Sequence, residues 1–109
     1  MIRRTLTEHG YVVRAVGTAT DARALEGAPP DLLLTDIILP DGNGIDLARD
    51  LAVRWPAAGV LYMSGYAGEH LEAVGTLPPE AHLVPKPFAT DVLLARVREV
   101  LERRRGAAA

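Results

Sequence analysis

The feature that most limits how this chain can fold is an apolar run that ends in one carboxylate and a sharp turn. The run Leu32–Leu34 leads to Asp36, and Pro40, Gly42 and Gly44 follow at once. A continuous apolar strand is typical of a parallel sheet covered on both faces. We expect the two glycines to supply turn conformations. Because open α/β sheets bind ligands beyond the carboxyl ends of their strands, Asp36 is predicted to lie at a functional edge.

The composition excludes several classes of protein. The 109 residues suffice for one domain, and without cysteine there is no disulfide framework and no cysteine-based metal or redox chemistry. A formal net charge of −2 gives no overall attraction to nucleic acid or to an anionic membrane. No apolar run approaches the length of a membrane span. We therefore expect a cytoplasmic domain over residues 1–105, a disordered tail over residues 106–109, and neither nucleic acid nor membrane as a partner.

Helical and strand patterns alternate along the chain. Apolar residues at helical spacing predict helices over residues 1–9, 21–26, 44–55, 69–74 and 90–104. Thr18 or Thr20 is expected to cap the second of these helices. Apolar and β-branched runs predict strands over residues 11–16, 32–36, 60–63 and 83–84. Such alternation indicates an α/β fold, with a parallel sheet and helices on both of its faces.

Three of the predicted strands end in polar groups that could meet at one edge of the sheet. These groups are the Asp36 carboxylate, the Ser64 hydroxyl and the Lys86 ammonium. A carboxylate can act as a nucleophile toward phosphorus, and an ammonium can neutralise part of a phosphoryl charge. Because phosphoryl transfer relies mainly on positioning and charge neutralisation, few residues suffice. Asp41, in the loop after Asp36, is interpreted as a solvated loop acid.

With these residues in view, the chain resembles the receiver domain of two-component response regulators. Three segments in the right order carry the resemblance: Leu32–Gly44, Tyr62–Tyr66 and Lys86–Phe88. The match spans essentially the whole chain and implies a flavodoxin-like, doubly wound parallel sheet. The sequence of the second segment, and the end of the chain just after the last predicted helix, look most like the receiver of a hybrid sensor kinase.

The resemblance also implies a function. Asp36 would accept a phosphoryl group from a histidine kinase or its phosphotransfer domain, Ser64 would report it, and Lys86 would contact it. Pro87 falls where the family usually has a cis peptide bond after the lysine. Such a protein is a phosphoacceptor in a phosphorelay and is not an enzyme in the usual sense.

The chain departs from the family pattern in two respects. Family receivers begin with a central strand that ends in adjacent acids holding Mg²⁺, and neither the strand nor the acid pair is found here. The ligands that remain are Asp36 and the backbone carbonyl of Ile38, so we expect weak Mg²⁺ binding. Leu83 stands at the switch position, three residues before Lys86, where the family usually has an aromatic residue. Pro85 removes one backbone donor from the last strand.

A sheet without its central first strand leaves two rows of backbone groups without partners. Each buried unpaired group costs about 1–3 kcal/mol, against a native stability of about 5–15 kcal/mol. We see three outcomes: the 11–16 strand slides over to pair with the 32–36 strand, two chains exchange elements, or another protein donates a strand. We expect a homo-oligomer with rearranged or exchanged N-terminal elements.

Other interpretations remain open beside the phosphoacceptor. The runner-up is a degenerate receiver that acts as an interaction or dimerisation module without phosphorylation, which the missing acid pair and Leu83 favour. A third is an ordinary receiver whose first strand has been cut away. A fourth is an unrelated small α/β ligand-binding domain, which the three aligned motifs disfavour.

Overall fold

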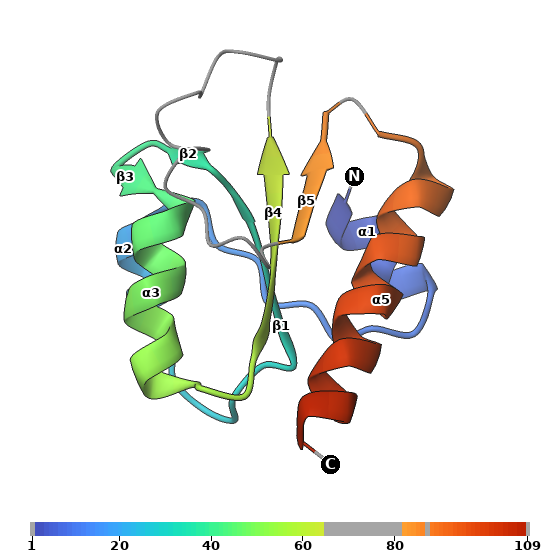
Figure 1. Cartoon of the computed structure of the whole chain (residues 1–109). Helices are drawn as coiled ribbons and strands as arrows, with labels where there is room; N and C mark the ends of the chain where they lie inside the picture. Colours follow the sequence, from blue (N-terminus) through green and yellow to red (C-terminus); the bar gives the residue numbers. More distant parts are fainter. Residues whose placement is uncertain (1, 65–81, 87, 109) are drawn as a thin grey trace.

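The fold is built on a three-stranded parallel sheet. It was obtained as a computed structural model, which describes residues 2–64, 82–86 and 88–108. β1 (Leu32–Asp36) pairs with β4 (Gly59–Ser64), which pairs with β5 (His82–Pro85). The three carboxyl ends therefore lie at the same edge of the sheet, at the top of Figure 1. This arrangement confirms the predicted α/β class.

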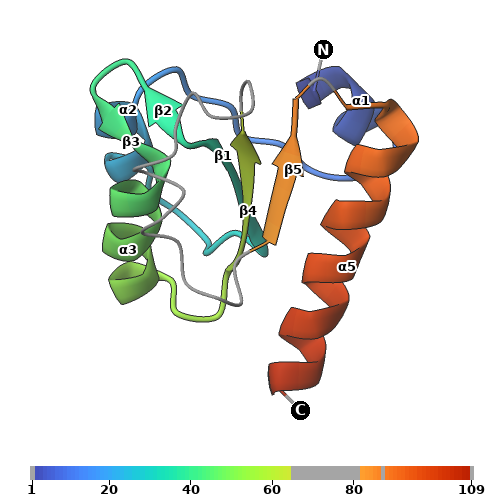
Figure 2. The same ribbon diagram turned by 45° about the horizontal axis from the view of Figure 1, so that its top comes forward.

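Helices cover both faces of the sheet. α3 (Gly44–Arg54) lies on one face and α5 (Thr90–Ala108) on the other, as Figures 1 and 2 show. α2 (Ala19–Arg23) accompanies α3, and α1 (Ile2–Glu8) accompanies α5. The Thr18 side chain caps α2, as one of the two predicted alternatives, although this helix is shorter than the expected 21–26 span. The predicted helix over 69–74 lies outside the described residues.

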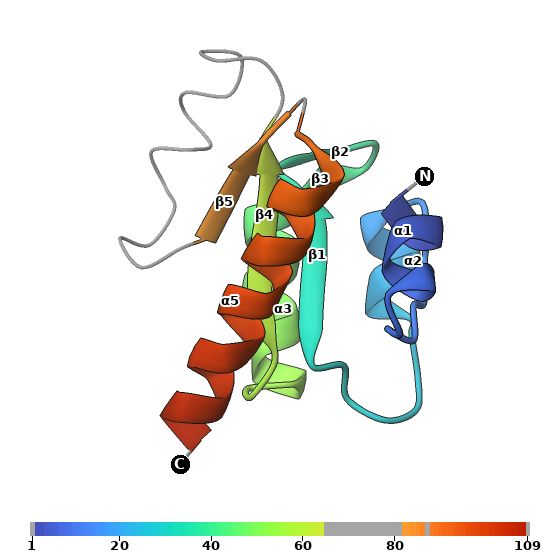
Figure 3. The same ribbon diagram turned by 90° about the vertical axis from the view of Figure 1, so that its right-hand side faces the viewer.

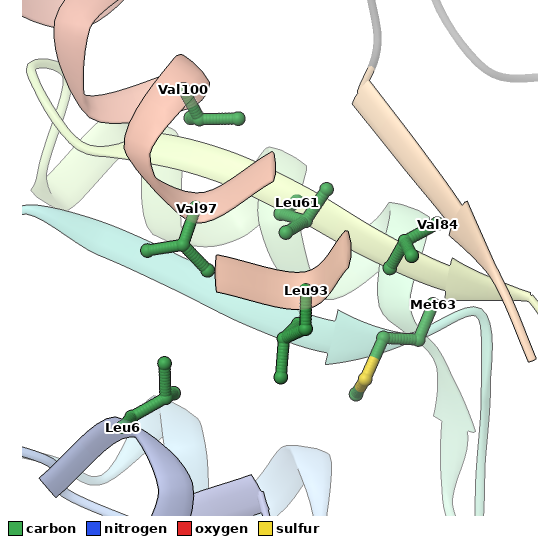
Figure 4. Packing of buried hydrophobic residues seen from close by; sticks show 7 residues of the cluster. All are labelled: Leu6, Leu61, Met63, Val84, Leu93, Val97 and Val100. Atoms are coloured by element: carbon green, nitrogen blue, oxygen red, sulfur yellow. The ribbon is translucent and has the colours of Figure 1, made fainter. Parts of the chain in front are cut away.

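Apolar packing on the two faces explains why β1 is apolar along its length. The cluster on the α5 side, shown in Figure 4, consists of Leu6, Leu61, Met63, Val84, Leu93, Val97 and Val100. The clusters on the α3 side consist of Ala19, Ala22, Leu47, Leu51 and Trp55, and of Ile37, Ile45, Ala48 and Tyr62. Leu32 and Leu34 pack against the first cluster and Leu33 against the other two. A fully buried valine, leucine, isoleucine or methionine side chain contributes about 1.5–3 kcal/mol.

The segment over residues 11–16 is not a strand, so the prediction of one there is wrong. It keeps an alternating pattern, since Tyr11 and Val13 pack against the α5-side cluster while Val12 is 98% exposed. Figure 3 shows α1 and α2, which this segment connects, lying beyond the β1 edge of the sheet. A strand needs the backbone of a neighbour, and the segment does not reach β1. Sliding over to pair with β1 is therefore not the outcome observed.

Arg14 holds this segment to a different part of the chain. Its guanidinium donates to the carbonyl oxygens of Glu26 at 2.7 Å and Ala28 at 2.8 Å. Both acceptors belong to the connection between α2 and β1. The arginine thus ties the extended segment to that connection, away from the sheet.

The edge of β1 that faces away from β4 carries backbone groups with no strand beside them in the described ranges. Gly59 N donates to Asp31 O at 2.9 Å, and Ile37 N donates to Met63 O at 3.1 Å. Since backbone groups alternate in direction along a strand, those of Leu32 and Leu34 point to the other side. No strand among the described residues pairs there.

The final helix is longer than predicted. α5 continues to Ala108, past the expected end near residue 104. Residues 106–108 are therefore helical, where a disordered tail was expected, and two of the three are alanines with high helix propensity. In the described part of the chain, no helix is both long and apolar enough to span a membrane.

Gly59 is expected to be essential for the close approach of β4 and α5. A Cβ atom added at Gly59 would lie 2.6 Å from Val100 Cγ1, a stiff and buried side chain. Gly59→Ala should lower the free energy of unfolding by about 1–3 kcal/mol, as overpacking does. Urea denaturation measures this change.

Gly17→Ala is the matched control, because an added Cβ there meets nothing within 4 Å. It should change the free energy of unfolding by no more than about 0.5 kcal/mol. Equal losses in the two variants would contradict the packing argument.

Candidate functional site

The carboxyl ends of the three strands bring two of the predicted site residues into contact. Lys86, directly after β5, places its Nζ 2.5 Å from Asp36 Oδ1 at the end of β1. Ser64 ends β4 opposite Pro85 of β5. The Ser64 side chain and Pro87 lie outside what the structure describes. The predicted Asp36–Lys86 neighbourhood is thus present, although the two residues are 50 positions apart in the sequence.

The backbone around Asp36 is tightly held. Thr35 is buried, and its hydroxyl donates to the carbonyl oxygen of Asp36 at 2.9 Å. A Cβ atom at Gly44 would collide with that same carbonyl oxygen. Gly44 is therefore needed for close approach, and not for a turn conformation as predicted. The positive φ belongs to Gly42, at +155°, where the turn expectation is correct.

A short antiparallel hairpin follows Asp36 and leads into α3. It consists of β2 (Ile38–Leu39) and β3 (Gly42–Asn43). At its base, Gly44 N donates to Ile37 O at 2.7 Å. Asn43 caps α3, with its side-chain oxygen accepting from Asp46 N at 2.8 Å. The backbone next to Asp36 is thus continuous with a helix start that is fixed by its own cap.

Asp41, at the tip of this hairpin, is exposed as predicted, but its carboxylate also accepts hydrogen bonds that the sequence did not indicate. Its Oδ1 accepts from Ala19 N at 2.8 Å, and its Oδ2 accepts from Thr20 N at 3.0 Å and Thr20 Oγ1 at 2.6 Å. These hydrogen bonds, that of the Thr20 hydroxyl above all, lower the pKa of Asp41 from 3.8 to about 2. These hydrogen bonds could not be predicted from the sequence, because the donors lie some twenty residues earlier and no local pattern indicates them.

The Asp36–Lys86 pair is open to solvent. Each side chain is 40% exposed, so the ion pair stabilises the fold by little. Exposure has a chemical consequence, since a partner molecule can reach the carboxylate directly. The lysine places a positive charge where negative charge on a transferred group would accumulate.

Leu83, at the predicted switch position, is half-buried in β5. It packs against the cluster that contains Ile37 and Tyr62. Burial raises the pKa of the Tyr62 phenol. Leu83 thus belongs to the same apolar cluster as the residue that follows Asp36.

The donor set for a metal ion is small. The predicted donors are the Asp36 carboxylate and the backbone carbonyl of Ile38, and Lys86 already contacts the carboxylate. Among the described residues, no group of three or more His, Cys, Asp or Glu side chains could hold a metal ion. Structural Mg²⁺ sites generally combine one or two carboxylates with water and phosphate oxygens, so this set is at the lower limit.

A comparison with known protein families identifies the fold. A family model described as the response regulator receiver domain matches residues 1–98. The chain belongs to this family. The flavodoxin-like architecture predicted from the sequence is thereby confirmed, with three parallel strands in the described part of the receiver domain.

Individual relatives include both kinases and regulators. The receiver domain is 37% identical to the transcriptional regulatory protein KdpE of Mycobacterium tuberculosis over 109 residues, covering 98% of this chain and 47% of KdpE. It is 30% identical to the sensor kinase CckA of Brucella abortus over 105 residues, covering 92% of this chain and 11% of the kinase. The chain thus spans less than half the length of either protein.

A solved structure has the same fold. The crystal structure of a response regulator receiver protein from Sinorhizobium medicae superimposes with a TM-score of 0.79 at 30% identity. The alignment covers 94% of this chain and 84% of that one.

The low pKa of Asp41 makes a defined contribution to the acid stability of the receiver domain. Because the pKa is below the ordinary 3.8 in the folded state, the stabilisation is present above pH 3.8 and is lost as the pH falls through about 2. Asp41→Asn should therefore destabilise the fold at neutral pH. The difference from wild type should shrink between pH about 4 and about 2 in urea denaturation. A difference that is the same at both ends of this range would contradict the assignment.

Proposed function

We propose that this receiver domain accepts a phosphoryl group on Asp36 from a histidine kinase or its phosphotransfer domain. The observation that supports it is the pairing of the exposed Asp36 carboxylate with Lys86 at the carboxyl ends of β1 and β5, the two strands that flank β4. It acts as a phosphoacceptor with slow self-hydrolysis, and not as an enzyme that turns over an external substrate.

In the proposed reaction, a carboxylate oxygen of Asp36 attacks the phosphorus atom of a phosphohistidine. The new oxygen–phosphorus bond forms as the phosphorus–nitrogen bond breaks, and the electron pair of that bond leaves with the imidazole, which takes up a proton. Lys86 stays next to the carboxylate and offsets the charge of the phosphoryl oxygens. Ser64, at the end of β4, is proposed to donate a hydrogen bond to one of these oxygens.

Mg²⁺ is the proposed cofactor, bound weakly. Asp36 and the Ile38 carbonyl would hold it, with phosphoryl oxygens and water as the other ligands. A bound Mg²⁺ supplies neutralisation of the phosphoryl charge. Because the described residues offer one carboxylate at this point, Lys86 carries a larger share of that neutralisation here than it would beside an acid cluster.

The proposed partner is a sensor histidine kinase or its phosphotransfer domain in the cytoplasm, with neither nucleic acid nor membrane bound by this domain. Similarity to a sensor kinase and to a transcriptional regulatory protein fits either position in a phosphorelay. We favour the receiver of a hybrid sensor kinase, because the sequence of Tyr62–Tyr66 resembles that subtype. The output surface is proposed to include the segment over 69–74, Leu83 and α5.

A second candidate function is a receiver that works as an interaction module without phosphorylation. One observation favours it: the described residues contain no cluster of three acids for a metal ion. In this case Asp36→Ala would leave partner binding unchanged. If Asp36 is the phosphoacceptor, the same substitution removes the site of phosphorylation and with it the phosphorylation signal.

We further propose that the receiver domain forms a homo-oligomer through the β1 edge. The described part of the chain presents two complementary features, a β1 edge with no paired strand and a β-branched segment over 11–16. Arg14 keeps the segment away from the β1 edge of its own chain. Two copies can satisfy both features if the 11–16 segment of one pairs with β1 of the other, in an exchange of strands.

Phosphorylation of Asp36 is tested with acetyl phosphate and millimolar Mg²⁺. The intact protein should gain the mass of one phosphoryl group, and Asp36→Asn should gain none because it lacks the nucleophilic oxygen pair. The control is Asp21→Asn, another exposed acid, which should be modified as wild type. Absence of any modification in the wild-type protein would contradict the phosphoacceptor function and would favour the interaction module.

The oligomer is tested with a charge placed on the 11–16 segment. Val12→Lys should shift the mass in light scattering from dimer toward monomer, because a charged residue on an edge strand opposes pairing. Val53→Lys is the matched control, since Val53 is 86% exposed on the outer side of α3. A wild-type protein that is monomeric at all concentrations, or an equal shift in both variants, would contradict the exchange.

A further inference from the structure

The hairpin after Asp36 is anchored to α2 through the carboxylate of Asp41. Three hydrogen bonds converge on the Asp41 carboxylate at its tip, from Ala19 N, Thr20 N and Thr20 Oγ1. Pro40 and Asp41 form the turn between β2 and β3, so the carboxylate lies as far from the base of the hairpin as the chain allows. The tip is thus attached to α2, an element distant in sequence.

The helix that receives Asp41 is itself fixed. Ala19 and Ala22 of α2 are buried in the cluster with Leu51 and Trp55. Arg23 of α2 forms an ion pair at 2.8 Å with Asp50 of α3. Arg54 of α3 donates to Arg23 O at 3.0 Å. These contacts do not involve Asp41, so α2 provides a support whose position the hairpin does not determine.

The base of the same hairpin is in direct contact with the backbone of Asp36. Gly44 N binds Ile37 O, and Gly44 lies so close to Asp36 O that no side chain fits between them. Any swing of the hairpin therefore displaces the peptide groups on either side of the phosphoacceptor. With the tip attached to α2 and the base to α3, such a swing is prevented at both ends.

We propose that Asp41 is a positioning residue for phosphoryl transfer to Asp36. It holds the hairpin against α2 and thereby keeps the Asp36 carboxylate in line with an incoming phosphoryl group. The inference rests on the proposed phosphoacceptor function. Asp41 itself does not touch the reacting atoms. Small displacements of a reacting group cost up to about 100-fold in rate, so the loss of one hydrogen-bonded anchor has a measurable effect.

The decisive experiment compares two Asp→Asn variants, both at acids that contact α2. Asp41→Asn removes the anchor from the hairpin, because an amide cannot accept from all three donors. Asp50→Asn removes the ion pair with Arg23 and leaves the hairpin untouched. The single-turnover rate of phosphorylation by acetyl phosphate should fall about 10–100-fold in the first variant and stay unchanged in the second.

A third variant separates positioning from general loss of stability. Thr20→Val removes the hydroxyl donor and keeps both backbone donors to Asp41. It should lower the rate by less than Asp41→Asn, and the double variant should be no slower than Asp41→Asn alone. Amide hydrogen exchange of residues 38–44 in the unphosphorylated protein should be faster in Asp41→Asn and unchanged in Asp50→Asn.

The possible results distinguish this inference from the proposed function. If the wild-type protein takes up no phosphoryl group, the phosphoacceptor function is wrong and the positioning role with it. If the wild-type protein is phosphorylated and Asp41→Asn reacts at the same rate, the positioning role alone is overturned. A loss of unfolding free energy in Asp41→Asn with an unchanged rate per folded molecule also overturns it.

Discussion

The parallel pairing of β1 with β4 determines where each group of the site lies. In the observed register Asp36 is opposite Met63, and its neighbours Thr35 and Ile37 are buried. A shift by one residue would move each side chain of β1 to the opposite face of the sheet, and it would displace the carboxylate along the strand. The packing of the leucines on both faces therefore fixes the register, and the register brings the carboxylate next to Lys86.

The two edge strands of the described sheet, β1 and β5, differ in how they are protected against pairing with another chain. Edge strands in soluble proteins are generally protected by charges, prolines or short length. β5 is short and ends in Pro85, which has no backbone donor. β1 is apolar on both faces, and in the described residues no strand pairs with its outer edge. The homo-oligomer proposed above would cover this edge.

Much of the fold could be predicted because its signals are local. The apolar run of β1, the cap at Thr18 and the periodic apolar residues of α3 each depend on a few adjacent positions. The meeting of Asp36 with Lys86 followed from topology, since parallel strands deliver their carboxyl ends to one edge. The role of Asp36 in phosphoryl transfer stays a prediction.

The features that could not be predicted depend on partners distant in sequence. Residues 11–16 have the composition of a strand, but a strand exists only where a neighbour supplies hydrogen bonds. Asp41 looks like any loop acid until α2 is placed beside it. Gly44 looks like a turn residue in the sequence. The structure shows that it must be glycine because its Cα lies close to the carbonyl oxygen of Asp36.

The position of Trp55 gives the two helical layers different optical properties. It is the one tryptophan of the chain, and it is buried where α3 meets α2. The Arg54 guanidinium covers its ring at 4.6 Å from the centroid and also reaches back to the carbonyl oxygen of Arg23 in α2. The tryptophan fluorescence of the protein therefore originates in the layer of α2 and α3, which supports the hairpin. A movement of α2 away from α3 can be followed by emission without any attached dye.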